Sequence, residues 1–97
     1  MRYEIEFAPQ AFRDHKDLDA HVRAEVRDAI ETHLRHEPKR TRKSRIKRLR
    51  GLSRPQYRLR VGDIRVFYDV SDRAVEILAI VAKSQAKKWL ERRGEKS

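Results

Sequence analysis

The residues best suited to chemistry lie on a predicted β-hairpin. Residues 57–70 alternate apolar and polar side chains on both sides of Gly62-Asp63, a pair that suits a two-residue type II′ turn. Pairing the two arms outward from this turn places Arg60 directly opposite Arg65, with Arg58 on the same face. Like charges directly opposite each other destabilise a sheet by roughly a few tenths of a kcal/mol. We therefore predict that this face binds an anion; the alternative is a solvated basic face that keeps the protein soluble.

Phosphate is the anion that these side chains suit best. Guanidinium groups bind oxyanions through paired hydrogen bonds and stay charged at any physiological pH. Three aromatic residues near the arginines, Phe67, Tyr68 and Trp89, could stack on an unpaired base. The basic set comprises Arg58, Arg60 and Arg65 on the hairpin, Lys47, Arg48 and Arg50 before it, and Lys83 after it.

The composition fits one domain with a polyanionic partner. The 97 residues include 25 Lys and Arg against 15 Asp and Glu, giving a formal net charge of +10. A chain of this length builds one core, so we treat residues 1–97 as a single domain. The absence of cysteine excludes disulfides and thiolate metal sites. The sequence shows neither a signal peptide nor an apolar run that could span a bilayer, which predicts a cytoplasmic protein.

Other catalytic or metal-binding patterns are weak. His33 and His36 share a helix face beside Glu37, but no third ligand is evident, so we predict no metal site. Asp69 and Glu76 are isolated acids, which we predict to be salt-bridge partners rather than proton carriers. The sequence has no glycine-rich phosphate loop and no nucleophile elbow, and we predict no cofactor.

The elements that must position the basic face follow from periodicity, and they predict an α+β fold. Apolar residues recur every four positions over 20–36, which predicts a helix, and residues 74–82 are almost continuously apolar, which predicts a central strand. With a short helix from Pro9, this gives a helical hairpin on one face of a small, mainly antiparallel sheet. The remaining predicted elements are strands over 2–8 and 46–52, a basic linker over 39–44, a last short helix capped by Ser84 and anchored by Trp89 and Leu90, and a frayed tail over 95–97.

The order of elements and the hairpin motif together resemble the RelE/ParE superfamily of bacterial toxins. The resemblance runs from Tyr3 to about Leu90, and its most specific parts are Lys47-Arg-Leu-Arg-Gly51 and Tyr57-Arg-Leu-Arg-Val-Gly-Asp-Ile-Arg-Val-Phe-Tyr68. It implies a twisted, mainly antiparallel sheet with a helical hairpin on one side. It also implies a toxin of a type II toxin–antitoxin system, with a cognate antitoxin whose C-terminal segment wraps the basic groove.

The resemblance favours the RelE branch, whose members cleave mRNA in the ribosomal A site by attack of the ribose 2′-OH on the neighbouring phosphate. It implies that Arg65 holds the scissile phosphate and that Arg58 and Arg60 occupy positions of family lysines or arginines. Such groups stabilise the charge that develops on a phosphate in the transition state. The predicted RNA-binding residues are Lys47, Arg48, Arg50, Phe67 and Trp89.

The C-terminal region departs from the RelE pattern. RelE-type nucleases carry an arginine after the last strand and a tyrosine or histidine a few residues later, whereas this chain has Lys83 and Trp89. Lys83 can supply positive charge and would have to carry the acid–base role, because Trp89 cannot transfer a proton. The first hypothesis is thus an mRNA endoribonuclease with an atypical catalytic region. The alternatives are a ParE-like toxin that inhibits DNA gyrase and a catalytically weak basic binding module of the same fold.

Overall fold

A computed structural model describes residues 2–42 and 44–97, so Lys43 of the predicted basic linker lies outside the described residues. The helices and strands follow in the order β1 (Glu4–Phe7), α1 (Pro9–Lys16), α2 (Ala20–Leu34), β2 (Ile46–Arg48), β3 (Leu52–Arg54), β4 (Tyr57–Val61), β5 (Ile64–Val70), β6 (Ala74–Ala82), α3 (Lys83–Arg93) and β7 (Glu95–Lys96). None of the described helices combines the length and apolar character needed to cross a membrane.

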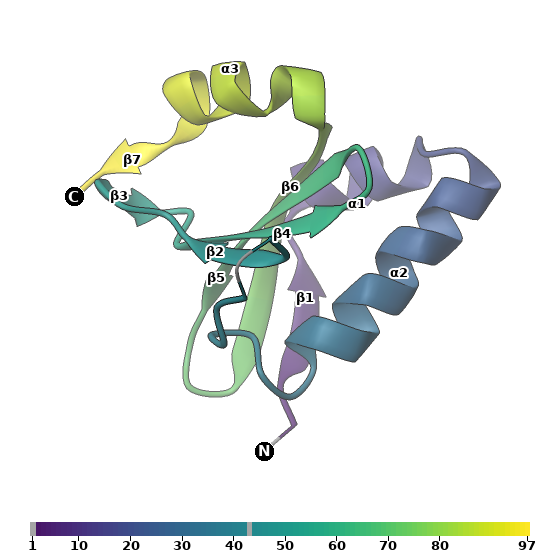
Figure 1. The fold of residues 1–97 in the computed structure, drawn as a ribbon, viewed down its shortest axis with the longest axis horizontal. Helices are drawn as coiled ribbons and strands as arrows, with labels where there is room; N and C mark the ends of the chain where they lie inside the picture. The colour runs from purple at the N-terminus through teal and green to yellow at the C-terminus, as the bar shows by residue number, and fades with distance from the viewer. Residues whose placement is uncertain (1, 43) are drawn as a thin grey trace.

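The described strands form a five-stranded sheet and a separate pair. The sheet has the order β1-β6-β5-β4-β2, in which only β1 and β6 run parallel, and the pair consists of β3 and β7. In Figure 1, α1 and α2 lie on one side of the sheet and α3 crosses the other. The predicted α+β fold, with a helical hairpin on one face and a short C-terminal helix, is confirmed.

The β4–β5 hairpin has the predicted register. Arg60 pairs with Arg65, and Arg58 pairs with Phe67. Gly62 has a φ of +56°, and no described residue other than glycine has a positive φ, so Asp63 does not share the left-handed conformation. A type II′ turn needs a positive φ at its first central position alone, whereas type I′ needs it at both. Glycine is favoured at that first position because it has no Cβ to clash.

A β-bulge lets the central strand β6 serve two cores. Phe67 of β5 pairs with Ala79, but the next residue, Tyr68, pairs with Ile77, which leaves Leu78 without a partner on β5. The extra residue resets the alternation of side chains, as bulges do. Ile77 and Tyr68 therefore face the larger core under α1 and α2, whereas Phe67, Leu78 and Ala79 pack with α3.

The helical hairpin covers the larger core. Three side chains of α2, Val26, Ile30 and Leu34, are buried against the sheet, as their spacing of four predicts. Helix α1 also caps the edge of β6 beyond the short β1, because the Asp14 carboxylate accepts a hydrogen bond of 2.9 Å from the backbone N–H of Ile80. This bond satisfies a strand donor that β1 is too short to reach.

The strand predicted over 46–52 is wrong as one element. Strand β2 ends at Arg48, and a separate strand β3 begins at Leu52. Between them Gly51 adopts a φ of +77°, a left-handed conformation that turns the chain away from the main sheet.

Two further predictions fail at the C-terminal end. Helix α3 begins at Lys83 with Ala82 as its N-cap, so Ser84 lies inside the helix instead of capping it. The tail predicted to fray forms β7, which pairs antiparallel with β3. The Ser53 hydroxyl also donates a hydrogen bond of 3.2 Å to the backbone carbonyl of Glu95. A two-residue strand gives no periodic signal, and its partner is 42 residues away in sequence.

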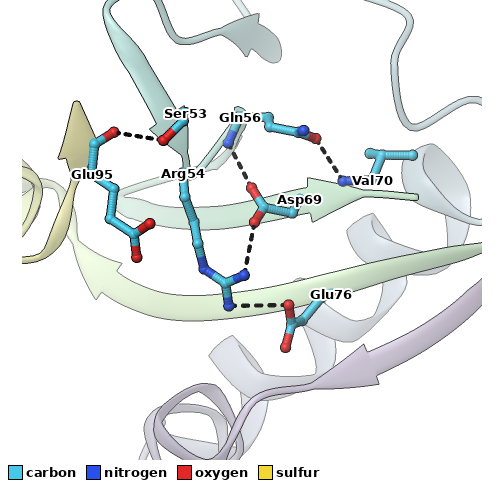
Figure 2. A network of polar contacts seen from close by, with 7 residues as sticks. All are labelled: Ser53, Arg54, Gln56, Asp69, Val70, Glu76 and Glu95. Atoms are coloured by element: carbon cyan, nitrogen blue, oxygen red, sulfur yellow. Dashed lines mark hydrogen bonds and ion pairs between the residues drawn. The ribbon is translucent and has the colours of Figure 1, made fainter. Parts of the chain in front are cut away.

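Figure 2 shows a polar network that ties β3 to β5 and β6. The guanidinium of Arg54 lies 3.5 Å from a carboxylate oxygen of Asp69 and 3.2 Å from one of Glu76. The backbone N–H of Gln56 donates to Asp69, and the Gln56 side-chain oxygen accepts from the N–H of Val70, each at 2.8 Å. Burial raises the pKa of Asp69, while the hydrogen bond from Gln56 and the charge of Arg54 oppose that rise. Both acids are salt-bridge partners, as predicted.

The buried hydroxyl of Tyr68 provides a test of the larger core. It donates a hydrogen bond of 2.7 Å to the carbonyl of Pro38, which fixes the segment after α2. We expect Tyr68→Phe to lower the free energy of unfolding by about 1–3 kcal/mol in chemical denaturation, because the buried carbonyl loses its donor. Tyr57→Phe is the matched control, since the Tyr57 ring stacks on Tyr68 at 5.4 Å but its hydroxyl has no partner among the described residues. Equal losses for both variants would contradict this account.

Candidate nucleic-acid interface

A hollow of about 580 Å³ lies between the polar face of the hairpin, β2 and α3. We call it the arginine cavity. Its apolar lining includes Phe67, Leu49 and Leu90. Its charged lining consists of six cations, Lys47, Arg58, Arg65, Lys83, Lys87 and Lys96, and one carboxylate, Glu91. Three segments distant in sequence therefore bring their positive charges to one shared hollow.

Arg65 is the most buried of the predicted site residues that carry a charge, with 8% of its surface exposed. One terminal nitrogen of its guanidinium donates to the carbonyls of Gly62 and Ile64, at 2.9 Å and 3.0 Å. The hairpin turn therefore anchors this arginine from behind. An anchored guanidinium keeps donors free for an oxyanion without the entropy loss of ordering a flexible side chain on binding.

Arg58 is held in the cavity at an energetic cost. Desolvation is the main cause that lowers its pKa, and the charges of Arg65 and then Arg60 lower it further. Its Nε is buried and has no hydrogen-bond partner. A buried donor without an acceptor costs about 1–3 kcal/mol. An oxyanion in the cavity would relieve the repulsion among the arginines.

A wider basic hollow adjoins the arginine cavity. It has a volume of about 1120 Å³ and shares Lys47, Leu49, Leu52 and Arg58 with the cavity. Its described lining contains no acidic side chain, and its basic side chains are Arg42, Lys47, Arg48, Arg50 and Arg58. The two hollows adjoin through these shared residues, so their basic side chains border one continuous surface.

Two of the predicted site residues have other surroundings. Arg60 is exposed and lines neither hollow, although its charge acts on Arg58. Arg48 lines the wider hollow, but its guanidinium lies 5.2 Å from the centre of the Tyr57 ring and donates to the carbonyls of Leu49 and Gln56. Arg60 therefore affects the site only through its charge, and the guanidinium of Arg48 is held by Leu49, Gln56 and Tyr57.

Phe67 and Trp89 are stacked on each other. Their ring centres are 5.0 Å apart and their planes differ by 6°. Both side chains are buried, with 1% and 7% of their surface exposed, so neither ring presents an open face to a base. Their evident role is to pack α3 onto the sheet and close the arginine cavity on one side.

Three charged residues of the cavity escaped the sequence analysis: Lys87, Glu91 and Lys96. The signal for two of them was present, because Lys83, Lys87 and Glu91 are spaced by four and so share one face of a helix. The spacing alone does not show which face of the helix lies over the arginines.

Comparison with known proteins identifies the family of this chain and solved structures that share its fold. A family model described as the ParE toxin of the type II toxin–antitoxin system parDE matches residues 5–87. The chain belongs to this family. The resemblance of this toxin to the RelE/ParE superfamily, predicted from its hairpin motif, is confirmed. No curated protein sequence gives a match.

Solved structures similar to this toxin are toxins and toxin–antitoxin complexes. A chain of the RelBE2 complex from Mycobacterium tuberculosis is 27% identical with a TM-score of 0.69, over 84% of this chain and 99% of that one. A chain of the RelE–RelB complex from Pyrococcus horikoshii OT3 is 27% identical with a TM-score of 0.64, over 88% and 99%. The YoeB dimer from Staphylococcus aureus, at 23% identity and a TM-score of 0.59 over 81% and 94%, shares the fold. The RelE-like branch is therefore supported.

The two central arginines should affect the stability of the toxin in opposite directions. We expect Arg58→Met to raise the free energy of unfolding by about 0.5–1 kcal/mol, because it removes an unpartnered buried donor, while the rest of the relieved repulsion is screened by solvent. Arg65→Met should lower it by about 1 kcal/mol, since two hydrogen bonds to the turn are lost. Thermal and urea unfolding measure both effects, and destabilisation by both variants would show that Arg58 is satisfied within the fold.

Proposed function

We propose that this toxin inhibits translation by cleaving mRNA on the ribosome, with the ribose 2′-OH attacking the neighbouring phosphate. The observation that carries this proposal is the arginine cavity, where Arg58 and Arg65 share one space with Lys83. Cations aimed at the place where charge develops on a phosphate stabilise the transition state.

The residues take distinct roles in this mechanism. Arg65, anchored by the turn, holds a non-bridging oxygen of the scissile phosphate. Arg58 binds the same phosphate and is stabilised by it. Lys83, exposed at the first turn of α3, neutralises the leaving 5′-oxygen and can give it a proton. Lys47, Arg48 and Arg50 hold the flanking phosphates in the wider hollow.

We further propose that the partner of this toxin is a cognate antitoxin that covers the basic face. The similar chains from M. tuberculosis and P. horikoshii come from complexes of a toxin with an antitoxin. Desolvation and, after it, repulsion from Arg65 and Arg60 lower the pKa of Arg58, and an acidic segment lying in the two hollows would relieve that repulsion. Such a segment would also exclude RNA from the same surface, so that one contact neutralises the toxin.

The sharpest variant for the cleavage proposal is Lys83→Ala. Lys83 is exposed and its backbone N–H alone is tied, to the carbonyl of Asp63, so the substitution leaves the fold intact. In a translation system with programmed ribosomes, we expect wild-type protein to cut the mRNA and Lys83→Ala to cut it about a hundredfold more slowly. Lys16→Ala, an exposed lysine of α1 that lines neither hollow, is the charge-matched control and should keep the wild-type rate. Translation arrest with intact mRNA would refute the proposal.

Inhibition of DNA gyrase is the second candidate function. The matched family model is named for ParE, and the described lining of the arginine cavity includes no histidine or tyrosine that could transfer a proton. Under the nuclease proposal, the toxin should leave gyrase supercoiling of relaxed plasmid unchanged. Blocked supercoiling or trapped cleavage complexes, together with uncut mRNA, would establish the gyrase function instead.

A further inference from the structure

The arginine cavity contains a single carboxylate among its described lining residues. Glu91 lies there with six cations, and no described histidine, tyrosine or second acid lines the same space. Attack by a ribose 2′-OH requires a group that takes up the hydroxyl proton, and the charged forms of lysine and arginine have no acceptor lone pair. An ionised carboxylate, in contrast, has no proton to donate and can accept a proton or a hydrogen bond. Glu91 is therefore the side chain in this cavity that is equipped to act as a base.

The helix places Glu91 on the same face as the proposed phosphate ligands. Lys83, Lys87 and Glu91 occur at intervals of four residues along α3, so they form one stripe. On another face of the helix, Trp89 stacks on Phe67 and fixes the rotation of α3 about its axis. The stripe consequently faces the cavity that Arg58 and Arg65 line from the opposite wall.

The C-terminal end of α3 is also held in place. Gly94 fits so closely that a Cβ there would lie 2.5 Å from the carbonyl oxygen of Leu90 and 3.1 Å from a methyl carbon of Leu52. Beyond it, β7 pairs with β3. These contacts restrict the last turn of the helix, which carries Glu91. The match to the family model covers residues 5–87, so Glu91 lies outside the matched residues.

Glu91 is free to act, whereas Asp69 and Glu76 are engaged. Asp69 and Glu76 both pair with Arg54 on the far part of β5 and β6. Glu91 has no hydrogen bond and no ion pair among the described residues, and its side chain is exposed to a substrate entering the cavity.

We propose that Glu91 is the general base of the cleavage reaction, an inference that rests on the nuclease function proposed above. Its carboxylate takes the proton of the 2′-OH while the 2′-oxygen forms a bond to phosphorus. The bond between phosphorus and the 5′-oxygen breaks, and the leaving oxygen receives a proton from the ammonium group of Lys83. The products are a 2′,3′-cyclic phosphate and a 5′-hydroxyl, and Arg58 and Arg65 bind the non-bridging oxygens throughout.

The test compares Glu91→Gln with wild type in single-turnover cleavage of mRNA on programmed ribosomes. We expect the cleavage rate to fall at least a hundredfold. Binding to a matching RNA with a 2′-deoxy nucleotide at the cleavage site should not weaken, because the variant removes a negative charge from a basic cavity. Glu25→Gln, an exposed glutamate of α2, is the charge-matched control and should behave as wild type.

The possible failures are distinguishable. If wild-type protein leaves mRNA intact, the nuclease function and the role of Glu91 both fall. If wild type cleaves and Glu91→Gln cleaves at an equal or higher rate, the nuclease function stands and the base is another group. Weakened binding of the deoxy-substituted RNA by Glu91→Gln would show that the substitution disturbs the cavity itself, and would also overturn the assignment.

Discussion

The register of the β4–β5 hairpin is the constraint on which the other features depend. Strand side chains alternate between the two faces of a sheet, so a shift of one residue would exchange the faces completely. In the observed register, Leu59 and Val66 face the helical hairpin, while Arg58 and Arg65 face the opposite side. The turn at Gly62 fixes this choice, because its positive φ is open to glycine and strained for most other residues. One dipeptide thus determines both the core and the basic face.

The clustered arginines of the basic face lower the stability of the fold but provide positive charge for binding an anion. Arg58 and Arg65 lie in one cavity, and the larger part of the cost falls on Arg58, which has lost solvent and lacks a partner for its Nε. A protein selected for stability alone would replace such a residue with an apolar one. An unfavourable clustering of like charges is expected where a ligand of opposite charge binds, since the ligand then balances the repulsion. A phosphate and an acidic partner segment would each meet this need, so under the proposed function one surface would serve both.

Helix α3 converts this face into a cavity. Without it, the arginines would stand on an open sheet surface in high dielectric, where their charges are screened. The Phe67–Trp89 stack packs α3 against the sheet, and the charged side chains of α3 then form one wall of the cavity. Two aromatic residues that the sequence suggests for base stacking therefore contribute to the site indirectly, by building its wall. The atypical C-terminal region of this toxin also supplies the one carboxylate in the described lining.

The sequence by itself determined the hairpin register, the helical hairpin, the central strand and the basic character of one face. These features follow from local periodicity and turn chemistry, in which each residue is constrained by neighbours a few positions away. The sequence also indicated the family, because the hairpin motif over Tyr57–Tyr68 is specific to it. Only the tertiary structure decided that Arg60 lies outside the cavity, that Phe67 and Trp89 pack on each other, and that Glu91 lies among the cations. Those outcomes depend on how α3 rotates and docks, and on β3 pairing with β7 across more than 40 residues. Such long-range packing leaves no periodic trace in the chain, since it is set by the combined shape of surfaces that meet only after folding.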